Sequence, residues 1–526
     1  MREHDVIVIG GGHNGLIAAG YLAKAGVDVC VCEALDEVGG DIVTNELTLP
    51  GFKHDRGATM HGVIQGNPLL ANDELELKSK YGLKYIYPEL SFATTFPDGT
   101  AICSYVDINK TCASIAKTCG QRDADAYRGL FEALSPASAF INAGSFSEPP
   151  AFGAMMAQFD SNPIGRNVIE SMFKSAYEVA CDWFEDPKMI MHITKMCTEM
   201  FFNPEDKGTA FYLYMLIPAA HMAPYALPVG GSGELSNALA RCVEDNGGTI
   251  LLNSPVEKIT VSQGAATGVV LKSGEEIKAR KRVLSSVDPR LMFGEGRMIE
   301  GALEPSVQQK IDRIADPFNV GMMIHCALDG VPKWSAGDEL LGALMVEPCP
   351  NLDAYRAEFD AIRYGRLPQE VCPLVCTQSL LDPSRAPQGK HTLYVGPYGP
   401  WNFADGGPDR WDEVKESYAD LTMRNLSQYI TNLDEIVIDR FVDTPLDMER
   451  WNPNNVHGGV TGPASYMYQM FSNRPITEMG RYRTPVENLW ICGMATHPSG
   501  GVTGGARAMV PSFLEDMGID FEDVID

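Results

Sequence analysis

Three glycines near the N-terminus have the spacing that lets a protein backbone hold a diphosphate. Gly10, Gly12 and Gly15 follow a short apolar run at 6–9 and precede an apolar-periodic stretch at 16–23. In such a pattern the first glycine makes a tight turn, the second lets the backbone approach a pyrophosphate, and the third lets a helix pack closely on a strand. The N-terminus of that helix faces the phosphate charge. The spacing therefore predicts a strand, a glycine turn and a helix built around a nucleotide.

An acidic residue follows at the position that contacts a ribose. Glu33 ends a second predicted strand at 27–32, where a carboxylate can accept hydrogen bonds from ribose hydroxyls. A glycine-rich turn without a nucleotide is the alternative interpretation, but strand, helix, second strand and terminal acid all occur in register. An acid at this position favours an unphosphorylated ribose, and hence NAD or FAD rather than NADP.

Further glycine-rich segments occur along the chain. Gly39 and Gly40 can bring backbone N–H groups to a pyrophosphate, and the segment 228–231 opens a predicted helix. Near the C-terminus, 493–505 is dense in glycine and leads into a last predicted helix at 506–517. Glycine allows close approach of the backbone, so these segments indicate a chain that lies against an extended ligand.

Taken in chain order, these segments resemble the FAD-dependent oxidoreductases of the phytoene desaturase and carotenoid isomerase type, within the amine-oxidase-like flavoprotein superfamily. In that group the sequence is most similar to the branch that contains pyridine nucleotide-disulphide oxidoreductase domain-containing protein 2. The stretches that carry the resemblance are 10–16, 51–57, 228–256, 285–289, 444–447, 474–475, 482–485 and 496–501. The resemblance implies one non-covalently bound FAD.

The resemblance also implies an α/β fold. It predicts a Rossmann-like FAD-binding domain assembled from discontinuous segments, with an inserted mixed α+β substrate domain that consists of a mostly helical cap and a mixed sheet. The FAD-binding domain is predicted at 1–70, 226–290 and 444–526, and the substrate-binding domain at 71–225 and 291–443.

Family position assigns roles to individual cofactor-binding residues. It implies that Glu33 binds the adenosine ribose and that Val256 binds the adenine through its backbone. Gly493 and residues 501–503 would lie along the pyrophosphate, the ribityl chain and the flavin ring. The full set of predicted cofactor-binding residues is Gly10, Gly12, His13, Asn14, Gly15, Glu33, Gly39, Gly40, Val256, Gly493, Gly501, Val502 and Thr503.

Two positions depart from the family pattern. The residue after the glycine pair is often arginine in the family but is Asp41 here, which removes a cation near the flavin. The family's His-Pro-Gly reads His497, Pro498 and Ser499 in this chain, which adds a hydroxyl and restricts the backbone. Both departures concern the detailed flavin contacts.

Methionine is concentrated in the middle of the chain. Nine of the 24 methionines fall between Met155 and Met222, with aromatic residues among them. Thioethers and aromatic rings together make an adaptable apolar surface, so one interpretation is a pocket wall for an apolar or ring-containing substrate. Helical core is the other interpretation, and a surface that dips into a membrane is a third.

A flavin accepts a hydride at N5 while a base or solvent removes the companion proton. His497, His61 and Tyr225 are the predicted catalytic residues, because they lie in or near segments expected to contact the flavin. His54 and His457 are further candidates for proton handling. Arg474 could anchor a substrate carboxylate or pair with nearby acids, and the second interpretation is preferred.

Four functions fit the sequence. The first is an FAD-dependent dehydrogenase or desaturase that forms an unsaturated product from an apolar or cyclic substrate. The alternatives are a flavin amine oxidase, a redox-neutral flavin-dependent isomerase, and a non-enzymatic binding protein on the same fold. The electron acceptor is left open among oxygen, a quinone and a carrier protein. A disulphide reductase is disfavoured because 41–70 contains no cysteine and because Cys30 and Cys32 lie on a predicted strand.

Composition limits the partners. The 526 residues include 69 acidic and 42 basic side chains, a formal charge of −27, which disfavours binding to nucleic acid and to anionic lipid. We therefore expect no nucleic-acid partner and disfavour membrane contact. Thirteen scattered cysteines indicate reduced thiols, and their spacing predicts no metal site. With no secretory signal recognised, the expected location is the cytoplasm.

Overall fold

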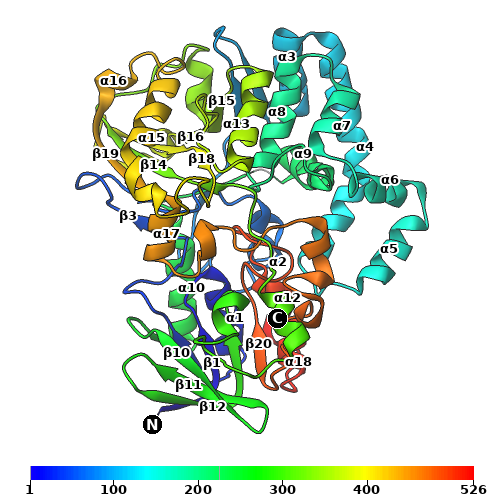
Figure 1. The fold of residues 1–526 in the computed structure, drawn as a ribbon, viewed down its shortest axis with the longest axis vertical. Helices are drawn as coiled ribbons and strands as arrows, with labels where there is room; N and C mark the ends of the chain where they lie inside the picture. The colour runs from blue at the N-terminus through cyan, green and yellow to red at the C-terminus, as the bar shows by residue number, and fades with distance from the viewer. Residues whose placement is uncertain (1, 224, 526) are drawn as a thin grey trace.

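Two seven-stranded sheets organise the molecule, one in the lower half and one in the upper half of Figure 1. The computed structural model describes residues 2–223 and 225–525. Segments from the two ends of the chain meet between the sheets, where orange and red C-terminal loops lie beside blue N-terminal ones (Figure 1).

The lower sheet is the nucleotide-binding sheet predicted from the glycine motif. Its parallel strands are β9, β2, β1, β12 and β20, and the antiparallel strands β10 and β11 extend the edge along the first part of β12. Helix α1 (His13–Lys24) connects β1 to β2 and packs beside α10 (Gly233–Asp245) and α18 (Ala506–Glu515). The strands are β1 (Arg2–Ile9), β2 (Val29–Cys32), β9 (Thr249–Leu251), β10 (Val256–Ser262), β11 (Ala265–Leu271), β12 (Glu276–Ser285) and β20 (Leu489–Ile491).

The upper sheet is mixed, as expected for the inserted domain. All its neighbouring strands are antiparallel except β15 and β6, which run parallel. In order across the sheet the strands are β19 (Val437–Asp443), β14 (Met323–Leu328), β17 (His391–Gly396), β16 (Leu374–Cys376), β15 (Ala343–Pro348), β6 (Leu90–Thr95) and β7 (Ala101–Tyr105). Helices α13 (Leu352–Arg363) and α15 (Arg410–Leu426) lie over it.

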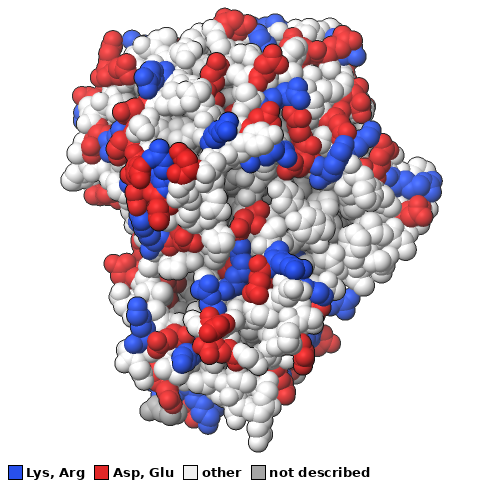
Figure 2. Space-filling model, in the orientation of Figure 1, with Lys and Arg blue, Asp and Glu red and all other residues white. Residues whose placement is uncertain are grey.

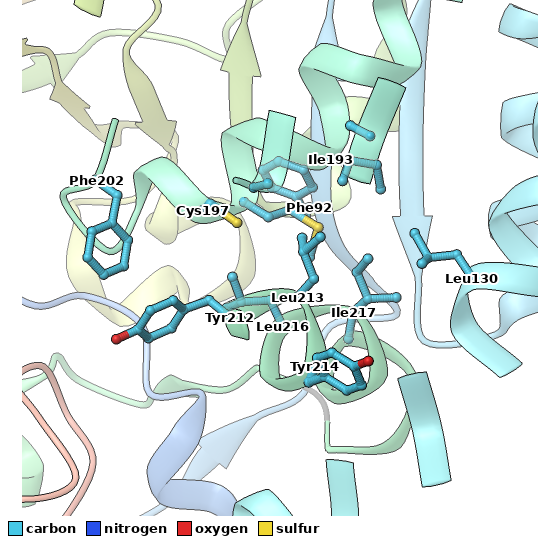
Figure 3. Close-up of a cluster of buried hydrophobic side chains, with 14 of the residues drawn as sticks. Phe92, Leu130, Ile193, Cys197, Phe202, Tyr212, Leu213, Tyr214, Leu216 and Ile217 are labelled. Atoms are coloured by element: carbon cyan, nitrogen blue, oxygen red, sulfur yellow. The ribbon is translucent and has the colours of Figure 1, made fainter. Parts of the chain in front are cut away.

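A helical cap stands beside the upper sheet (Figure 1). Its helices are α3 (Ile108–Cys119), α4 (Gln121–Ser145), α5 (Phe152–Asp160), α6 (Pro163–Ser171), α7 (Ala176–Trp183), α8 (Pro187–Thr198) and α9 (Leu213–Met222). Figure 3 shows the core between them, where Phe92 of β6, Ile193 of α8 and Leu216 and Ile217 of α9 converge.

The domain prediction needs two changes at its boundaries. Every strand of each large sheet comes from the set of segments predicted for that domain. However, Leu75, Leu77 and Leu83 pack into the core around α1, and Ile311 and Ile314 pack against β10–β12. The predicted boundaries at 70 and 290 are therefore too early, because these apolar segments cover the faces of the nucleotide-binding sheet without carrying a nucleotide motif.

The methionine-rich segment contributes both to the helical core and to a cavity wall, which are two of its three interpretations. Met155, Met172, Met189 and Met191 are buried in the core of the helical cap. Met196, Met200 and Met215 line an apolar cavity described below, whereas Met222 is exposed. Only part of the cluster is therefore pocket wall.

Charged side chains of both signs are scattered over the face in Figure 2, and no continuous basic patch covers this face. Within residues 2–223 and 225–525, no helix combines the length and the apolar character needed to cross a membrane.

Candidate cofactor and substrate site

The glycine turn after β1 leaves the start of α1 open to an anion. Gly10 has a φ of +95°, and a Cβ at Gly15 would overlap the carbonyl oxygen of Gly10, so both positions require glycine. Helix α1 begins at His13 with no side-chain hydrogen bond at its N-cap and no acidic residue in its first turn. Its first amide groups therefore suit a diphosphate, which would supply the missing acceptors.

A groove runs along this turn and collects glycines from distant parts of the chain. Gly12 and Gly39 are bridged strand to strand, and Gly40 and Gly493 face the same groove. The groove is lined by Gly12, His13, Asn14, Gly15, Gly39, Gly40, Asp41, Ser286, Asn452, Asn454, Gly493 and Met494. Because most of this lining is glycine and amide, it fits the diphosphate of the predicted FAD.

Glu33 is the residue predicted to bind the ribose. Its Oε2 accepts a hydrogen bond from the Gly11 N–H at 2.6 Å and its Oε1 accepts one from the Leu35 N–H at 2.8 Å. A carboxylate has about four lone-pair positions, so acceptor capacity remains for ribose hydroxyls. The N–H of Ser254 donates to the Glu33 carbonyl at 2.7 Å, which holds the chain leading to Val256 beside the predicted ribose position.

Asn14 acts at the site through its neighbours. Its Oδ1 accepts a hydrogen bond from the Ala506 N–H at 3.0 Å, and its Nδ2 lies 3.0 Å from Nε2 of His13. These contacts hold the start of α18 and the His13 ring against the glycine turn. We therefore assign Asn14 a positioning role.

A cavity of about 200 Å³ lies between the two domains, next to the diphosphate groove. His13, Asp41 and Met494 line both spaces. From the FAD-binding segments the cavity is lined by His13, Asp41, Ile42, Gly57, Ala58, Thr59, Met60, Val460, Thr461, Met494, Gly501 and Val502, and from the substrate segments by Glu199, Phe201, Gly321, Met322, Met323, Leu374, Tyr394, Gly396 and Tyr398. This cavity is where the predicted flavin ring would lie.

Asp41 stands where the family often has an arginine. Its Oδ1 accepts hydrogen bonds from Nδ2 of Asn452 at 3.0 Å and of Asn455 at 2.9 Å, and its Oδ2 has no partner among the described residues. Burial raises the pKa of Asp41 to about 6. The folded chain therefore favours the protonated form of Asp41. The resulting contribution to the free energy of unfolding is fully present below the unfolded pKa of 3.8 and is lost as the pH rises through about 6.

We expect FAD affinity to fall as Asp41 ionises. The negative charge of an ionised Asp41 repels the diphosphate. The affinity for FAD should therefore drop on the order of tenfold between about pH 5 and about pH 8. Asp41→Asn keeps the acceptor oxygen for both asparagines and removes the charge, and it should flatten this dependence. Titrating apoprotein with FAD at each pH measures the effect; an equal slope in both proteins would contradict this explanation.

A second cavity of about 200 Å³ adjoins the first and is almost entirely apolar. Both cavities share Met60, Glu199, Gly501 and Val502. The second is lined by Met60, Gly62, Val63, Ser91, Phe92, Met196, Glu199, Met200, Met215, Leu216, Ala220, Tyr225, Met345 and the loop 498–503, which includes Thr503. Figure 3 shows two of these lining residues, Phe92 and Leu216, within a cluster of buried hydrophobic side chains.

A third, larger space of about 530 Å³ continues from the apolar cavity. Met200, Met215, Leu216 and Tyr225 line both. The two spaces together run between α4, α9 and the 62–68 segment. An apolar molecule longer than the inner cavity could therefore extend into the outer one.

The two predicted catalytic histidines do not line either inner cavity. His61 is buried, with Nδ1 2.9 Å from Oη of Tyr85 and Nε2 2.7 Å from Oγ of Ser232, and burial lowers its pKa to about 3. His497 has Nε2 2.9 Å from the carbonyl oxygen of Gly144, and burial lowers its pKa to about 4. Their contacts point to positioning roles in the loops around the site.

Tyr225 is the predicted catalytic residue that the structure places in the apolar cavity. Burial raises its pKa to about 12, so it keeps its proton at neutral pH. His54 and His457 lie away from both inner cavities: His54 pairs with Thr48, and His457 forms an ion pair with Asp316 at 2.8 Å.

The preferred interpretation of Arg474 is wrong. Its side chain is fully buried and pairs with no acid among the described residues. The guanidinium donates instead to the backbone carbonyls of Pro463, Ala464, Met494 and Thr496. Because these carbonyls belong to the two loops that flank the flavin cavity, Arg474 clamps the loops together.

The sequence reasoning missed Glu199 and Tyr398. Glu199 follows α8 and lines both inner cavities, and its Oε1 accepts a hydrogen bond from Oη of Tyr398 at 2.5 Å. A signal was present, because Glu199 is the one acidic residue in the apolar run 187–202 and lies four residues after Lys195. Tyr398 carried no such local signal.

Comparison with known proteins agrees with this geometry. The family described as "Flavin containing amine oxidoreductase" matches residues 15–508. The chain is 28% identical to pyridine nucleotide-disulfide oxidoreductase domain-containing protein 2 of Rattus norvegicus, over 96% of this chain and 92% of that protein. It is 26% identical to one component of the limonene dehydrogenase of Castellaniella defragrans, over 99% and 96%. A putrescine oxidase structure shares the fold, with a TM-score of 0.64 at 16% identity and coverage of 98% and 99%.

Proposed function

We propose, from the premise that this chain belongs to the flavin containing amine oxidoreductase family and is an FAD-dependent oxidoreductase, that it dehydrogenates an apolar or cyclic substrate to an unsaturated product. The observation that carries the proposal is the apolar cavity beside Gly501 and Val502, lined mainly by methionine and aliphatic side chains. Such a lining releases water when it binds an uncharged substrate. The likeness to a component of a limonene dehydrogenase supports the same substrate class.

Different residues of the chain bind the cofactor and orient the substrate in this reaction. FAD, when bound, supplies the acceptor for a hydride. The first turn of α1 and the glycines of the groove hold the diphosphate, and Glu33 holds the ribose. The apolar cavity orients the substrate and excludes water, which keeps the reacting carbons next to the flavin cavity.

Three other functions predict different behaviour. A flavin amine oxidase would take a cationic amine, which the single carboxylate of the apolar cavity could pair. A redox-neutral isomerase would form product without consuming an electron acceptor. A binding protein without activity would keep its flavin oxidised with every substrate. Net consumption of an acceptor with an uncharged substrate distinguishes the proposed dehydrogenase from all three.

Filling the apolar cavity should slow turnover without loss of the cofactor. Met200 lines the inner and outer spaces, and the larger indole ring of Met200→Trp would occupy both. We expect kcat/KM for uncharged cyclic substrates to fall at least about tenfold, since overfilling a packed space costs about 1–3 kcal/mol. The FAD content per chain should not change.

The matched control is Met222→Trp. Met222 is on the same methionine-rich segment but is 60% exposed and lines neither space. It should leave kcat/KM within about a factor of two, because exposed substitutions have small effects. Equal losses in both variants would show that the cavity does not bind the substrate.

The proposed location is the cytoplasm. All thirteen cysteines are free thiols, and most of them are buried. Unpaired thiols persist in a reducing compartment, which supports this proposal.

A further inference from the structure

Glu199 is a charged residue in the wall of an apolar cavity, which is an unusual place for a carboxylate. It lines both inner cavities, where they share Met60, Gly501 and Val502. Among the residues that line the apolar cavity it is the one charged side chain. A carboxylate in such surroundings is costly unless other groups support it, so the contacts behind Glu199 decide its role.

Tyr398 and Lys195 supply that support. The buried Tyr398 hydroxyl donates to Oε1 of Glu199, and Lys195 Nζ lies 5.0 Å from the centroid of the Tyr398 ring. Lys195 stands one helical turn before Glu199 and is fully buried, with its Nζ donating to the Cys372 carbonyl at 2.7 Å. No described residue donates a hydrogen bond to Oε2 of Glu199. The geometry thus fixes one oxygen and leaves the other free.

Glu347 does not neutralise Lys195. Its Oε1 is 3.6 Å from Lys195 Nζ, but both carboxyl oxygens lack a hydrogen-bond partner among the described residues. Burial raises the pKa of Glu347 well above its ordinary value, the neighbouring Glu199 carboxylate raises it further, and the Lys195 charge only partly opposes this. Glu347 is therefore neutral beside Glu199, and the positive charge of Lys195 acts on the Glu199 carboxylate.

Asp41 lines the flavin cavity but not the apolar cavity, and the tyrosine and histidines near the cavities cannot readily accept a proton. Tyr225 keeps its proton because burial raises its pKa to about 12. Both ring nitrogens of His61 are in hydrogen bonds, and neither His61 nor His497 lines either inner cavity. His13 is buried, which lowers its pKa to about 4, and its Nε2 lies 3.0 Å from Asn14 Nδ2.

We propose that Glu199 is the catalytic base of the dehydrogenation, an assignment that rests on the proposed function. Two C–H bonds of adjacent substrate carbons break. One hydrogen leaves as a hydride, with both electrons of its bond, and reduces the FAD. The electron pair of the other C–H bond becomes the new π bond, and its proton passes to Oε2 of Glu199. The carboxylate also stabilises positive charge that develops on the substrate carbon as the hydride leaves.

The test compares Glu199→Gln with Glu205→Gln. Glu205 lies six residues further on, pairs with Arg356 on the surface and lines neither inner cavity. In anaerobic single turnovers with an uncharged cyclic substrate, Glu199→Gln should reduce its flavin about 10²–10⁴ times more slowly, as expected for loss of a general base. FAD content and visible spectrum should stay unchanged, and Glu199→Asp should restore part of the rate.

Binding of an apolar cation tests the charge of Glu199 without turnover, so indirect effects on the rates do not influence the result. The cyclohexyltrimethylammonium cation has an apolar body, and its nitrogen lacks the lone pair that amine oxidation uses. Calorimetry on the FAD-loaded chain should show at least about tenfold weaker binding to Glu199→Gln than to Glu205→Gln, because the cavity loses its one charge.

Two results would overturn the assignment. The first is flavin reduction by Glu199→Gln at the rate of Glu205→Gln; the second is equal affinity of both variants for the cation. A different result identifies failure of the proposed function itself: the unsubstituted chain would then show no flavin reduction with any uncharged substrate, while its FAD content remained complete.

Discussion

Arg385→Ala should lower the free energy of unfolding by about 3–5 kcal/mol, the cost of leaving a buried partner charge uncompensated. Arg385 is fully buried, and its guanidinium donates to the Asp55 carboxylate, to Asp382 and to the Pro228 carbonyl. Asp55 in turn accepts hydrogen bonds from Oγ1 of Thr44 and from the N–H of Ser232. The substitution therefore disrupts a network that connects the two domains beside the site.

Arg450→Ala is the matched control for that experiment. Arg450 also pairs with a carboxylate, that of Asp412 at 2.7 Å, but its side chain is 52% exposed. Exposed pairs contribute at most about 1 kcal/mol, so this variant should unfold close to the unsubstituted chain. Urea denaturation of both variants measures the difference. Similar midpoints for Arg385→Ala and Arg450→Ala would contradict the importance of the buried network.

Gly15→Ala should weaken FAD binding on the order of 100-fold. The new Cβ would overlap the Gly10 carbonyl oxygen, so α1 must move away from the turn that β1 supplies. That movement displaces the N–H groups that face the diphosphate, and each charge-assisted hydrogen bond lost costs about 1.5–3 kcal/mol. Fluorescence titration of apoprotein with FAD measures the loss.

The control substitutes a helical glycine that has free space. Gly153 lies in α5, and a Cβ there would meet no atom within 4 Å. Alanine increases helix propensity at both positions by up to about 1 kcal/mol, so a comparison isolates the steric effect at Gly15. If Gly15→Ala binds FAD as tightly as Gly153→Ala, the helix does not need its close approach to the turn.

The nucleotide half of the fold was predictable because its signals are local. The spacing of Gly10, Gly12 and Gly15, the apolar strand before them and Glu33 after them all lie within the first 33 residues. Together these signals are typical of a βαβ unit with a glycine turn, and β1, α1 and β2 form such a unit. The family resemblance then placed the distant glycines of 493–505 in the same site.

The substrate half was not predictable to the same depth, because its contacts join residues far apart in sequence. His61 was a reasonable catalytic candidate by position, yet Tyr85 and Ser232, 24 and 171 residues away, occupy its ring nitrogens. Glu199 is marked locally only as an acid in an apolar run, and its hydrogen-bond donor Tyr398 is 199 residues away. Side-chain pairing across such distances follows from tertiary packing, which no local pattern encodes.

The early domain boundaries have a similar cause. Leu75, Leu77 and Leu83 occupy ordinary apolar positions, and nothing in their spacing shows that they cover α1. Burial of apolar surface is non-directional, so an apolar segment can pack on either domain without a sequence signature. A glycine motif identifies a site, but it does not identify the segments that cover the sheet behind the site.

Anaerobic mixing of the FAD-loaded chain with a panel of matched compounds tests the central claim most directly. The panel should pair uncharged cyclic alkenes, ketones and polyenes with primary amines of similar size, and the loss of oxidised-flavin absorbance should be followed in time. The proposed dehydrogenase predicts that uncharged substrates bleach the flavin and yield a product with one more double bond. Bleaching by the amines alone, or by no member of the panel, would contradict it.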